Sequence, residues 1–302
     1  MHALITGSSG FVGHHLIRHL EAMGDAVTPT DRAMGGPDIS DRESVGQFVR
    51  DVQPDVVYHL AGQSDVAHSW ADPIGTYRAN VEGTLNILDA CRDAGVRRVI
   101  AVISADVYGR VTPDELPLNE RSPFRPVSPY AASKCAADLM CQQAHIGYGA
   151  DIVRVRPFTH IGPGQSTRFV TSALASRIAT AERDGIDAIP VGSLDTRRDF
   201  TDVRDVVRAY RLLATYGEAG EVYNVCSGVD VAIRDVAELL LARAERPIRL
   251  EFDPALARPA DVPVLRGDPT RVHQLTGWKP EFTLESTLRD VLDDWRSRLR
   301  RS

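Results

Sequence analysis

The chain has 302 residues, of which 43% are hydrophobic, 25% charged and 6% aromatic, and its formal net charge is −6. This composition is typical of a globular protein, and it excludes an intrinsically disordered chain, a collagen-like repeat and a small disulfide scaffold. Since no basic run is long enough to follow a phosphate backbone, the sequence predicts no nucleic-acid partner.

Short apolar runs alternate with amphipathic stretches along most of the chain. We predict strands near residues 2–6, 26–30, 55–61, 98–104, 151–157 and 221–226. The periodicity predicts helices near residues 11–23, 41–52, 73–94, 128–148, 169–184 and 202–216. Alternation at this spacing indicates right-handed crossovers between parallel strands. The predicted fold class is therefore α/β, a doubly wound parallel-sheet Rossmann fold.

The alternation loosens at residues 158–197 and again at residues 229–302. Neither segment is long enough for a comfortable separate domain. We expect the two to form one small C-terminal lobe over the carboxyl edge of the sheet, where ligands bind in folds of this kind. The dinucleotide-binding domain would then comprise residues 1–157 and 198–228.

Cysteine spacing and the first residues point to the cytoplasm. The four cysteines form no C-x-x-C pair, which predicts free thiols in a reducing compartment. No basic segment precedes the first apolar run, and no uncharged stretch approaches the ~20 residues of a membrane helix. His15 and His19 have the spacing of a zinc helix, but no third ligand is evident, so we predict no metal site.

A glycine-rich loop, TGSSGFVG at residues 6–13, directly follows the first predicted strand. Gly7, Gly10 and Gly13 would allow a tight turn and a close approach of backbone N–H groups to a pyrophosphate. The start of the following helix adds partial positive charge. The loop therefore predicts a dinucleotide site.

Asp31 ends the second predicted strand, where a carboxylate accepts both ribose hydroxyls of adenosine and repels a 2′-phosphate. Arg32, beside it, would instead attract that phosphate. We therefore expect NAD(H) to be favoured as the cofactor and NADP(H) to be possible.

Tyr130 and Lys134 are the strongest catalytic candidates. Lys134 is one of only two lysines in the chain, and four residues on a helix place both side chains on one face. An ammonium group beside a phenol, helped by a cationic nicotinamide ring, lowers the phenol's pKa from its usual value of about 10. Ser104 ends the fourth predicted strand, and Asp106 follows it as a possible second acid–base group.

These motifs together resemble the extended short-chain dehydrogenase/reductase family, whose members act on nucleotide-sugars. Further matching stretches are Leu60-Ala61-Gly62, Tyr130-Ala131-Ala132-Ser133-Lys134, Arg156-Pro157 and Arg197-Arg198-Asp199-Phe200. Within the family, THIGPGQ at residues 159–165 and TGWKP at residues 276–280 most resemble GDP-4-keto-6-deoxy-D-mannose reductases, which are close relatives of GDP-mannose 4,6-dehydratases.

The resemblance implies a role for each matching residue. Tyr130 would be the general acid, Ser104 would bind the substrate oxygen, and Lys134 would hold the nicotinamide ribose. Besides the glycine loop and Asp31, the implied cofactor contacts are Phe11, Val12, Arg32, Asp38, Ile39, Leu60, Ala61, Gly62, Asn80, Tyr130, Lys134 and Pro157. The implied nucleotide-sugar contacts are Thr159, Arg168, Arg198 and Arg258, with the last two on the diphosphate.

Two residues depart from the pattern of the family, and three functions remain as hypotheses. Thr159 and Ser193 stand where relatives commonly carry asparagine, which puts the sugar and the guanine base in doubt. The main hypothesis is a reductase that transfers hydride from NAD(P)H to the 4-keto group of GDP-4-keto-6-deoxy-D-mannose. With Asp106 taking part, the chain would instead be a GDP-mannose 4,6-dehydratase or a related epimerase. A non-catalytic dinucleotide sensor is the third. Relatives pair the helices matching 73–94 and 128–148, so a homodimer is implied.

Overall fold

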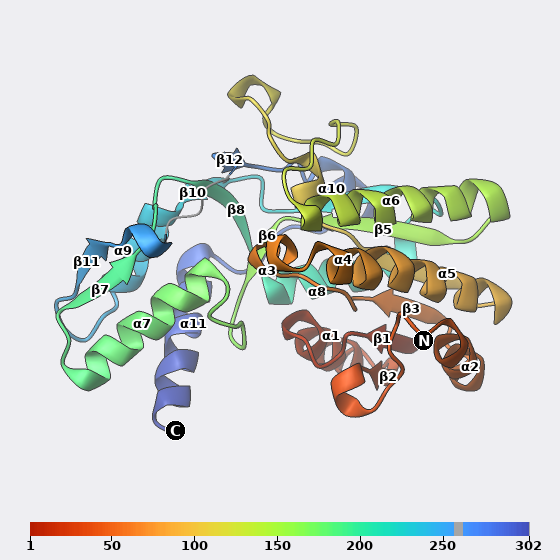
Figure 1. Cartoon of the computed structure of the whole chain (residues 1–302), viewed down its shortest axis with the longest axis horizontal. Coiled ribbons are helices and arrows are strands. Elements are labelled where there is room, and N and C mark those ends of the chain that lie inside the picture. Colours follow the sequence, from red (N-terminus) through yellow and green to blue (C-terminus); the bar gives the residue numbers. More distant parts are fainter. Residues whose placement is uncertain (257–261, 302) are drawn as a thin grey trace.

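A parallel six-stranded sheet lies at the centre of the molecule (Figure 1). The computed structural model describes residues 1–256 and 262–301. The strand order is β2-β1-β3-β4-β5-β9, with every neighbouring pair parallel. The strands are β1 (His2–Thr6), β2 (Ala26–Thr30), β3 (Val56–His59), β4 (Arg98–Val102), β5 (Ile152–Pro157) and β9 (Val222–Val225). The predicted doubly wound α/β fold is confirmed.

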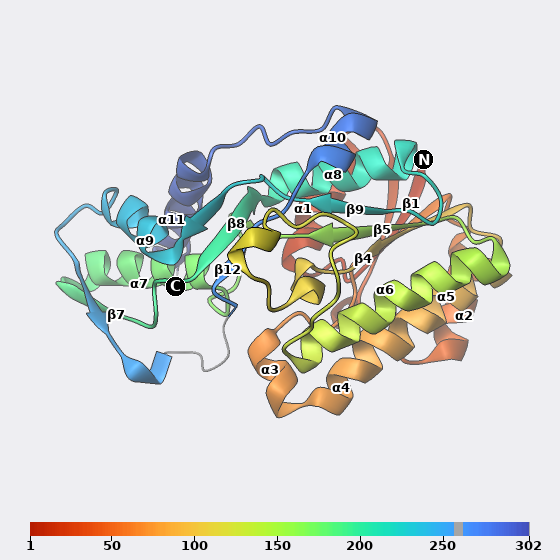
Figure 2. The same cartoon turned by 90° about the horizontal axis from the view of Figure 1, so that it is seen from above.

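Helices cover both faces of this sheet (Figure 2). One face carries α1 (Phe11–Ala22), α8 (Val203–Tyr216) and α10 (Thr270–Thr276), and the other carries α2 (Arg42–Val52), α5 (Gly83–Asp93) and α6 (Pro129–Tyr148). Successive strand residues alternate between the two cores: Val99 packs under the second group and Ile100 under the first. Burial on both faces explains why these strands are continuously apolar.

The structure divides the predicted helix 73–94 into three pieces. They are α4 (Pro73–Tyr77), the π-helical turn η2 (Arg78–Glu82) and α5, and a short unpredicted helix, α3 (Val66–Ala71), precedes them. The predicted strand 98–104 ends earlier, at Val102, because Ser104 caps a 3-10 turn, η3 (Ala105–Tyr108). Two further 3-10 turns are η1 (Arg32–Met34) and η4 (Pro113–Glu115).

The remaining elements gather beyond one end of the sheet (Figure 1). Their strands are β6 (Thr159–Ile161), β7 (Ala188–Val191), β8 (Arg197–Asp202), β10 (Asp230–Ala232), β11 (Arg249–Phe252) and β12 (Val264–Leu265). Their helices are α7 (Val170–Asp184), α9 (Ile233–Leu241) and α11 (Leu284–Leu299), and η5 (Pro254–Leu256) is a 3-10 turn. Most of them share a third apolar core. Residues 158–197 hold more strands than their sequence suggested. The division into two domains at the stated boundaries stays a prediction.

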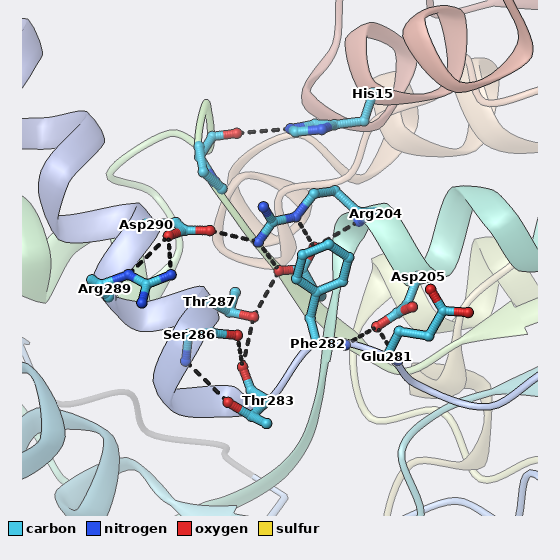
Figure 3. Close-up of polar contacts among 12 residues, drawn as sticks. His15, Arg204, Asp205, Glu281, Phe282, Thr283, Ser286, Thr287, Arg289 and Asp290 are labelled. Carbon is cyan, nitrogen blue, oxygen red and sulfur yellow. Dashed lines mark hydrogen bonds and ion pairs between the residues drawn. The ribbon is translucent and has the colours of Figure 1, made fainter. Parts of the chain in front are cut away.

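Arg204 joins these elements to the sheet, as Figure 3 shows. Its guanidinium donates to Asp202 at 2.6 and 2.9 Å and to Asp290 of α11 at 2.8 Å. Thr287 of α11 also donates to Asp202, at 2.7 Å. The C-terminal helix is thereby fixed to the start of α8, at the edge of the sheet where ligands bind in such folds.

Cys91, Cys135, Cys141 and Cys226 are buried free thiols. Among the described residues, no helix combines the length and the apolar character that spanning a membrane requires.

Candidate active site

A cleft of about 1780 Å³ opens where the sheet meets the outer elements. Pockets for single small ligands usually hold about 300–1,000 Å³, so this cleft has room for two ligands placed end to end. The predicted site residues that line it are Gly7, Gly10, Phe11, Val12, Gly13, Asp31, Arg32, Asp38, Ile39, Leu60, Ala61, Gly62, Ser104, Asp106, Tyr130, Lys134, Pro157, Thr159, Arg168 and Arg198.

The glycine loop fits a pyrophosphate because its own packing leaves no space for side chains. A Cβ on Gly7 would lie 2.7 Å from the backbone nitrogen of Ala61, and Gly7 has a φ of +70°. A Cβ on Gly13 would lie 2.5 Å from the carbonyl oxygen of Ser8. Gly10 is the N-cap residue of α1 (Phe11–Ala22), and no side-chain hydrogen bond caps the start of this helix in the described part of the chain. The first N–H groups of α1 are therefore left for an anion.

The end of β2, which lies beside the glycine loop, has side chains that fit an adenosine ribose. The Thr30 hydroxyl is buried, and it has no hydrogen-bond partner among the described residues. Asp31 Oδ1 accepts from the Ala33 backbone N–H at 2.8 Å, which leaves its second oxygen for a ribose hydroxyl. Arg32 Nη1 lies 3.1 Å from Asp38 Oδ2. That Asp31 and Arg32 discriminate between NAD and NADP stays a prediction.

His59 fixes the wall between the glycine loop and the catalytic residues, a role that sequence reasoning missed. The Thr84 hydroxyl donates to the Asn80 carbonyl at 2.7 Å, so it accepts from His59 Nε2 at 3.1 Å. His59 Nδ1 then accepts from Thr6 Oγ1 at 2.9 Å, and Thr6 accepts from the Ala61 N–H at 3.2 Å. Burial lowers the pKa of His59 to about 3, with a contribution from the Lys134 charge. The His59 ring therefore stays neutral. Each group in this series, from the Ala61 N–H to the Thr84 hydroxyl, donates its hydrogen to the next group.

Asn80 lies behind this wall and does not line the cleft. Its Oδ1 accepts from the Gln63 backbone N–H at 2.8 Å, and its Nδ2 donates to the Gln63 carbonyl and to Ser133 Oγ. The π-helical turn η2 places it there, as such turns often do at functional sites. Its implied cofactor contact stays a prediction.

Ser104 and Tyr130 face each other in the cleft, with Asp106 nearby. Ser104 Oγ accepts from the Asp106 backbone N–H at 3.1 Å, so its own proton is directed elsewhere. Burial raises the pKa of Tyr130, the Asp106 charge raises it further, and a hydrogen bond with Ser104 opposes both. In the protein alone burial dominates, so the predicted lowering of the Tyr130 pKa is not present there. A phenol held protonated is suited to act as an acid.

Lys134 lies on the same face of α6 as Tyr130, as the spacing predicted. Its Nζ donates to the Val102 carbonyl at 3.0 Å, and burial lowers its pKa to about 8. The ammonium form is therefore available near neutral pH, with its remaining hydrogens directed to the cleft that Lys134 lines.

Replacing Lys134 with methionine should reduce turnover about 100-fold, at the lower end of what acid–base groups contribute. The same change should raise the unfolding temperature of the cofactor-free protein at pH 7. The folded protein loses the Lys134 proton near pH 8, whereas the unfolded chain keeps it up to the usual value of 10.5. The free-energy cost of burying the Lys134 charge therefore destabilises the folded protein fully below pH 8. This cost decreases as the pH rises to 10.5.

Thermal unfolding at pH 7 and pH 10 measures this effect, and Lys279→Met, at the exposed second lysine, is the control. The difference between Lys134→Met and the wild type should shrink at the higher pH. Equal destabilisation at both pH values would rule out a buried charge at Lys134.

The four residues predicted to bind the nucleotide-sugar differ in their burial and in their position relative to the cleft. Arg198 is half-buried, lines the cleft and donates to the Val262 carbonyl at 2.8 Å. Arg168 is exposed at the cleft mouth, with its Nε 3.9 Å from Asp65 Oδ2. Thr159 lines the cleft from β6. Arg258 lies outside the described residues.

Two buried polar groups lining the cleft were not among the predicted contacts. Gln165 Oε1 and the Tyr210 hydroxyl have no hydrogen-bond partner in the described part of the chain. Gln165 ends the THIGPGQ segment, so its motif was visible, whereas Tyr210 lies on α8 with no motif to distinguish it from a core residue.

The chain is similar to known proteins over most of its length. Residues 33–291 match the family model described as GDP-mannose 4,6 dehydratase. The chain is 42% identical over 301 residues to a GDP-6-deoxy-D-mannose reductase of Pseudomonas aeruginosa, covering 98% of this chain and 97% of that protein.

Two solved structures are similar over nearly the whole chain. One, described as RMD from Pseudomonas aeruginosa complexed with NADPH, has a TM-score of 0.90 and 41% identity, covering 98% of this chain and 99% of that one. The other is a Thermus thermophilus UDP-glucose 4-epimerase in complex with NAD, with a TM-score of 0.88 and 28% identity and the same two coverages.

Proposed function

This chain belongs to the extended short-chain dehydrogenase/reductase family, and we propose that it reduces the 4-keto group of GDP-4-keto-6-deoxy-D-mannose with NAD(P)H. The observation that carries the proposal is the near full-length similarity to a GDP-6-deoxy-D-mannose reductase, combined with a cleft that brings Ser104, Tyr130 and Lys134 together. Family relatives are bound to NADPH and to NAD, so the protein uses a nicotinamide dinucleotide.

The proposed mechanism assigns one task to each catalytic side chain. The reduced nicotinamide, when bound, supplies a hydride to C4 of the sugar. Tyr130 gives its phenolic proton to the O4 oxygen as negative charge develops there, which its raised pKa permits. Ser104 donates its hydroxyl proton to the same oxygen, while its Oγ accepts from the Asp106 backbone N–H. Lys134 stabilises the tyrosinate left behind until solvent returns a proton.

Purified protein should consume reduced nicotinamide when GDP-4-keto-6-deoxy-D-mannose is added, with one sugar reduced for each dinucleotide oxidised. Absorbance of the reduced ring, followed in parallel with NADH and NADPH, measures this. A stable signal with both cofactors would contradict the reductase function.

The alternative reaction is 4,6-dehydration of GDP-mannose, and the observation that favours it is Asp106. This carboxylate lines the cleft and acts electrostatically on Tyr130. A dehydratase regenerates its dinucleotide during each turnover, whereas a reductase must exchange it. Conversion of GDP-mannose with no added reduced cofactor would support dehydration, and an epimerase would likewise act without net cofactor use.

Asp31 is the residue that we propose to set the cofactor preference towards NAD(H). Asp31→Asn should raise the NADPH-to-NADH ratio of kcat/KM at least about tenfold, because a charge facing the 2′-phosphate is removed. Asp51→Asn, an exposed carboxylate on α2, is the matched control. An unchanged ratio would show that Asp31 does not face the ribose.

We propose a homodimer formed through α4, α5 and α6, which lie side by side in Figure 1. Large apolar side chains are exposed on or next to these helices, namely Trp70, Ile74, Tyr77, Leu85, Leu139, Ile146 and Tyr148. Leu139→Arg should produce a monomer in light scattering, because a charge repeated across a twofold axis repels itself. Ile186→Arg, on another exposed apolar residue, should leave the mass unchanged. A monomeric wild type would contradict the proposal.

We also propose a cytoplasmic location, which the four buried free thiols support. Cell fractionation tests it.

A further inference from the structure

Asp199 of β8 is completely buried, and its carboxylate joins three separate stretches of the chain. Its Oδ1 accepts from the Ser227 backbone N–H at 2.7 Å and from the Ser227 hydroxyl at 2.6 Å. Its Oδ2 accepts from the backbone N–H groups of Gly228 at 2.9 Å and Gly267 at 3.2 Å. Burial raises the pKa of Asp199, and these four hydrogen bonds oppose that shift. A buried carboxylate is costly unless donors surround it, so Asp199 is committed to the segments that supply them.

The segments that supply the donors are fixed to the central sheet. Ser227 and Gly228 follow β9, which lies at one edge of that sheet. Gly267 follows β12, and a Cβ on it would lie 2.6 Å from Phe158 Cε2 and from Cys226 Sγ. Both of these side chains are buried in the core that α5 and α6 cover. The segment around Gly267 therefore fits closely against the dinucleotide-binding part of the molecule.

The strand that carries Asp199 belongs instead to the outer elements, since Phe200 of β8 packs in the third apolar core. Arg198 of the same strand lines the cleft. Its Nη1 donates to the carbonyls of Arg197 and Val262, both at 2.8 Å, which uses both hydrogens of that nitrogen. Val262 lies just before β12, which pairs with β8 so that Leu265 is opposite Arg198. The orientation of the Arg198 guanidinium thus depends on how β8 and β12 are held together.

On the premise of the proposed nucleotide-sugar reaction, with Arg198 on the diphosphate, we propose that Asp199 is a positioning residue for substrate binding that acts through Arg198. Its carboxylate fixes β8 to the ends of β9 and β12, so the guanidinium meets the diphosphate at a set distance from Tyr130. Asp199 is not among the described residues that line the cleft, so it acts without touching the substrate. Placement of this kind matters because a misplacement of about 1 Å costs as much as about 100-fold in rate.

Dissociation constants for GDP, measured by calorimetry, test this proposal without turnover. Asp199→Asn turns one carboxylate oxygen into an NH2 group, which cannot accept the hydrogen bonds that this oxygen accepts. The variant should bind GDP about tenfold more weakly, whereas its affinity for the reduced dinucleotide should stay within about twofold. In reduction assays, KM for the nucleotide-sugar should rise by the same factor, and kcat should change much less.

Glu182→Gln is the matched control, because Glu182 is also a carboxylate of the outer elements with only 7% of its side chain exposed, and Arg296 donates to it at 2.7 Å. Glu182 is not among the described residues that line the cleft, so the control should lose stability and keep its affinity for GDP. Thermal unfolding reports whether each variant is folded. If Asp199→Asn does not fold, Ser227→Ala removes one of the four donors and should weaken GDP binding about threefold.

A double-mutant cycle with Arg198→Met measures whether Asp199 acts through Arg198. Arg198→Met alone should weaken GDP binding at least about tenfold, because a charged donor to the diphosphate is lost. Adding Asp199→Asn or Ser227→Ala to Arg198→Met should then cause little further loss. Additive losses would show that Asp199 acts elsewhere, and equal weakening of GDP and dinucleotide would show a general structural role. Either result overturns the proposal.

The same measurements separate this inference from the proposed function. A wild type that binds no GDP would contradict the nucleotide-sugar function, and this inference with it. A wild type that binds GDP and reduces no sugar would contradict only the reductase reaction. Equal affinities of wild type and folded Asp199→Asn for GDP would contradict only the role of Asp199.

Discussion

Replacing Tyr130 with phenylalanine should lower kcat about 1000-fold while dinucleotide affinity stays within about twofold. The ring and its packing are kept, and only the phenolic proton that reaches the substrate oxygen is lost. Ser104 still polarises that oxygen, which leaves a residual rate above that in solution. Single-turnover reduction measured with saturating cofactor isolates the chemical step from product release.

Tyr216→Phe, at an exposed tyrosine on α8, is the matched control and should behave as wild type. A Tyr130→Phe enzyme with more than about a tenth of the wild-type kcat would refute the acid role, since general acids contribute at least about 100-fold.

The direction of the Tyr130 pKa shift also predicts a pH profile. Because burial raises this pKa above its usual value of 10, the phenol keeps its proton through neutral and mildly alkaline pH. Reduction should therefore hold its rate as pH rises through that range, whereas a reaction that begins with the tyrosinate as base would accelerate. A rate of reduction that increases with pH would contradict the assignment of Tyr130 as the acid.

Asp138→Asn should have the largest effect on stability, a loss of about 3–5 kcal/mol in the free energy of unfolding. Asp138 is completely buried and receives Arg154 Nη1 at 2.7 Å and Arg156 Nε at 2.8 Å. The asparagine leaves two buried guanidinium groups without their shared carboxylate. Chemical denaturation measures the loss.

Asp151→Asn is the control, because its ion pair with Arg98, at 2.9 Å, is partly exposed. Pairs near the surface contribute about 0–1 kcal/mol, so this variant should be much less affected. Similar stabilities for the two variants would mean that the buried pairs are no stronger than the partly exposed one.

The Asp138 cluster also connects the catalytic helix to its surroundings. Arg156 donates to the Tyr108 hydroxyl at 3.1 Å, and Tyr108 ends the η3 turn that Ser104 begins. Asp138 lies two turns along α6 from Tyr130. We therefore expect Asp138→Asn to lower turnover in addition to stability.

The sequence predicted those parts of the site whose residues lie close together along the chain. Gly7, Gly10 and Gly13 follow a strand directly, and Tyr130 and Lys134 share a helix face, so a parallel sheet suffices to bring them to one edge. The α/β fold itself follows from strand and helix periods.

What sequence could not predict depends on partners far apart in the chain. His59 lies 53 residues from Thr6, and their hydrogen bond exists only once β1 and β3 pair. The pKa direction of Tyr130 is set by burial, which no spacing reveals. The π-helical turn around Asn80 is equally hidden, because its residues have an ordinary helical pattern.

The packing of α11 against α7 and α9 has a consequence for biosynthesis. The glycine loop and the Tyr130 helix leave the ribosome within the first half of the chain, and domains generally begin to fold as they emerge. The third core waits for Leu288, Val291 and Leu292 of α11, which are synthesised much later than these elements. Because α8 and β9 also precede α11, a nascent chain would complete its central sheet before its third core, and ribosome-bound intermediates should bind NAD(P) before they can recognise a sugar.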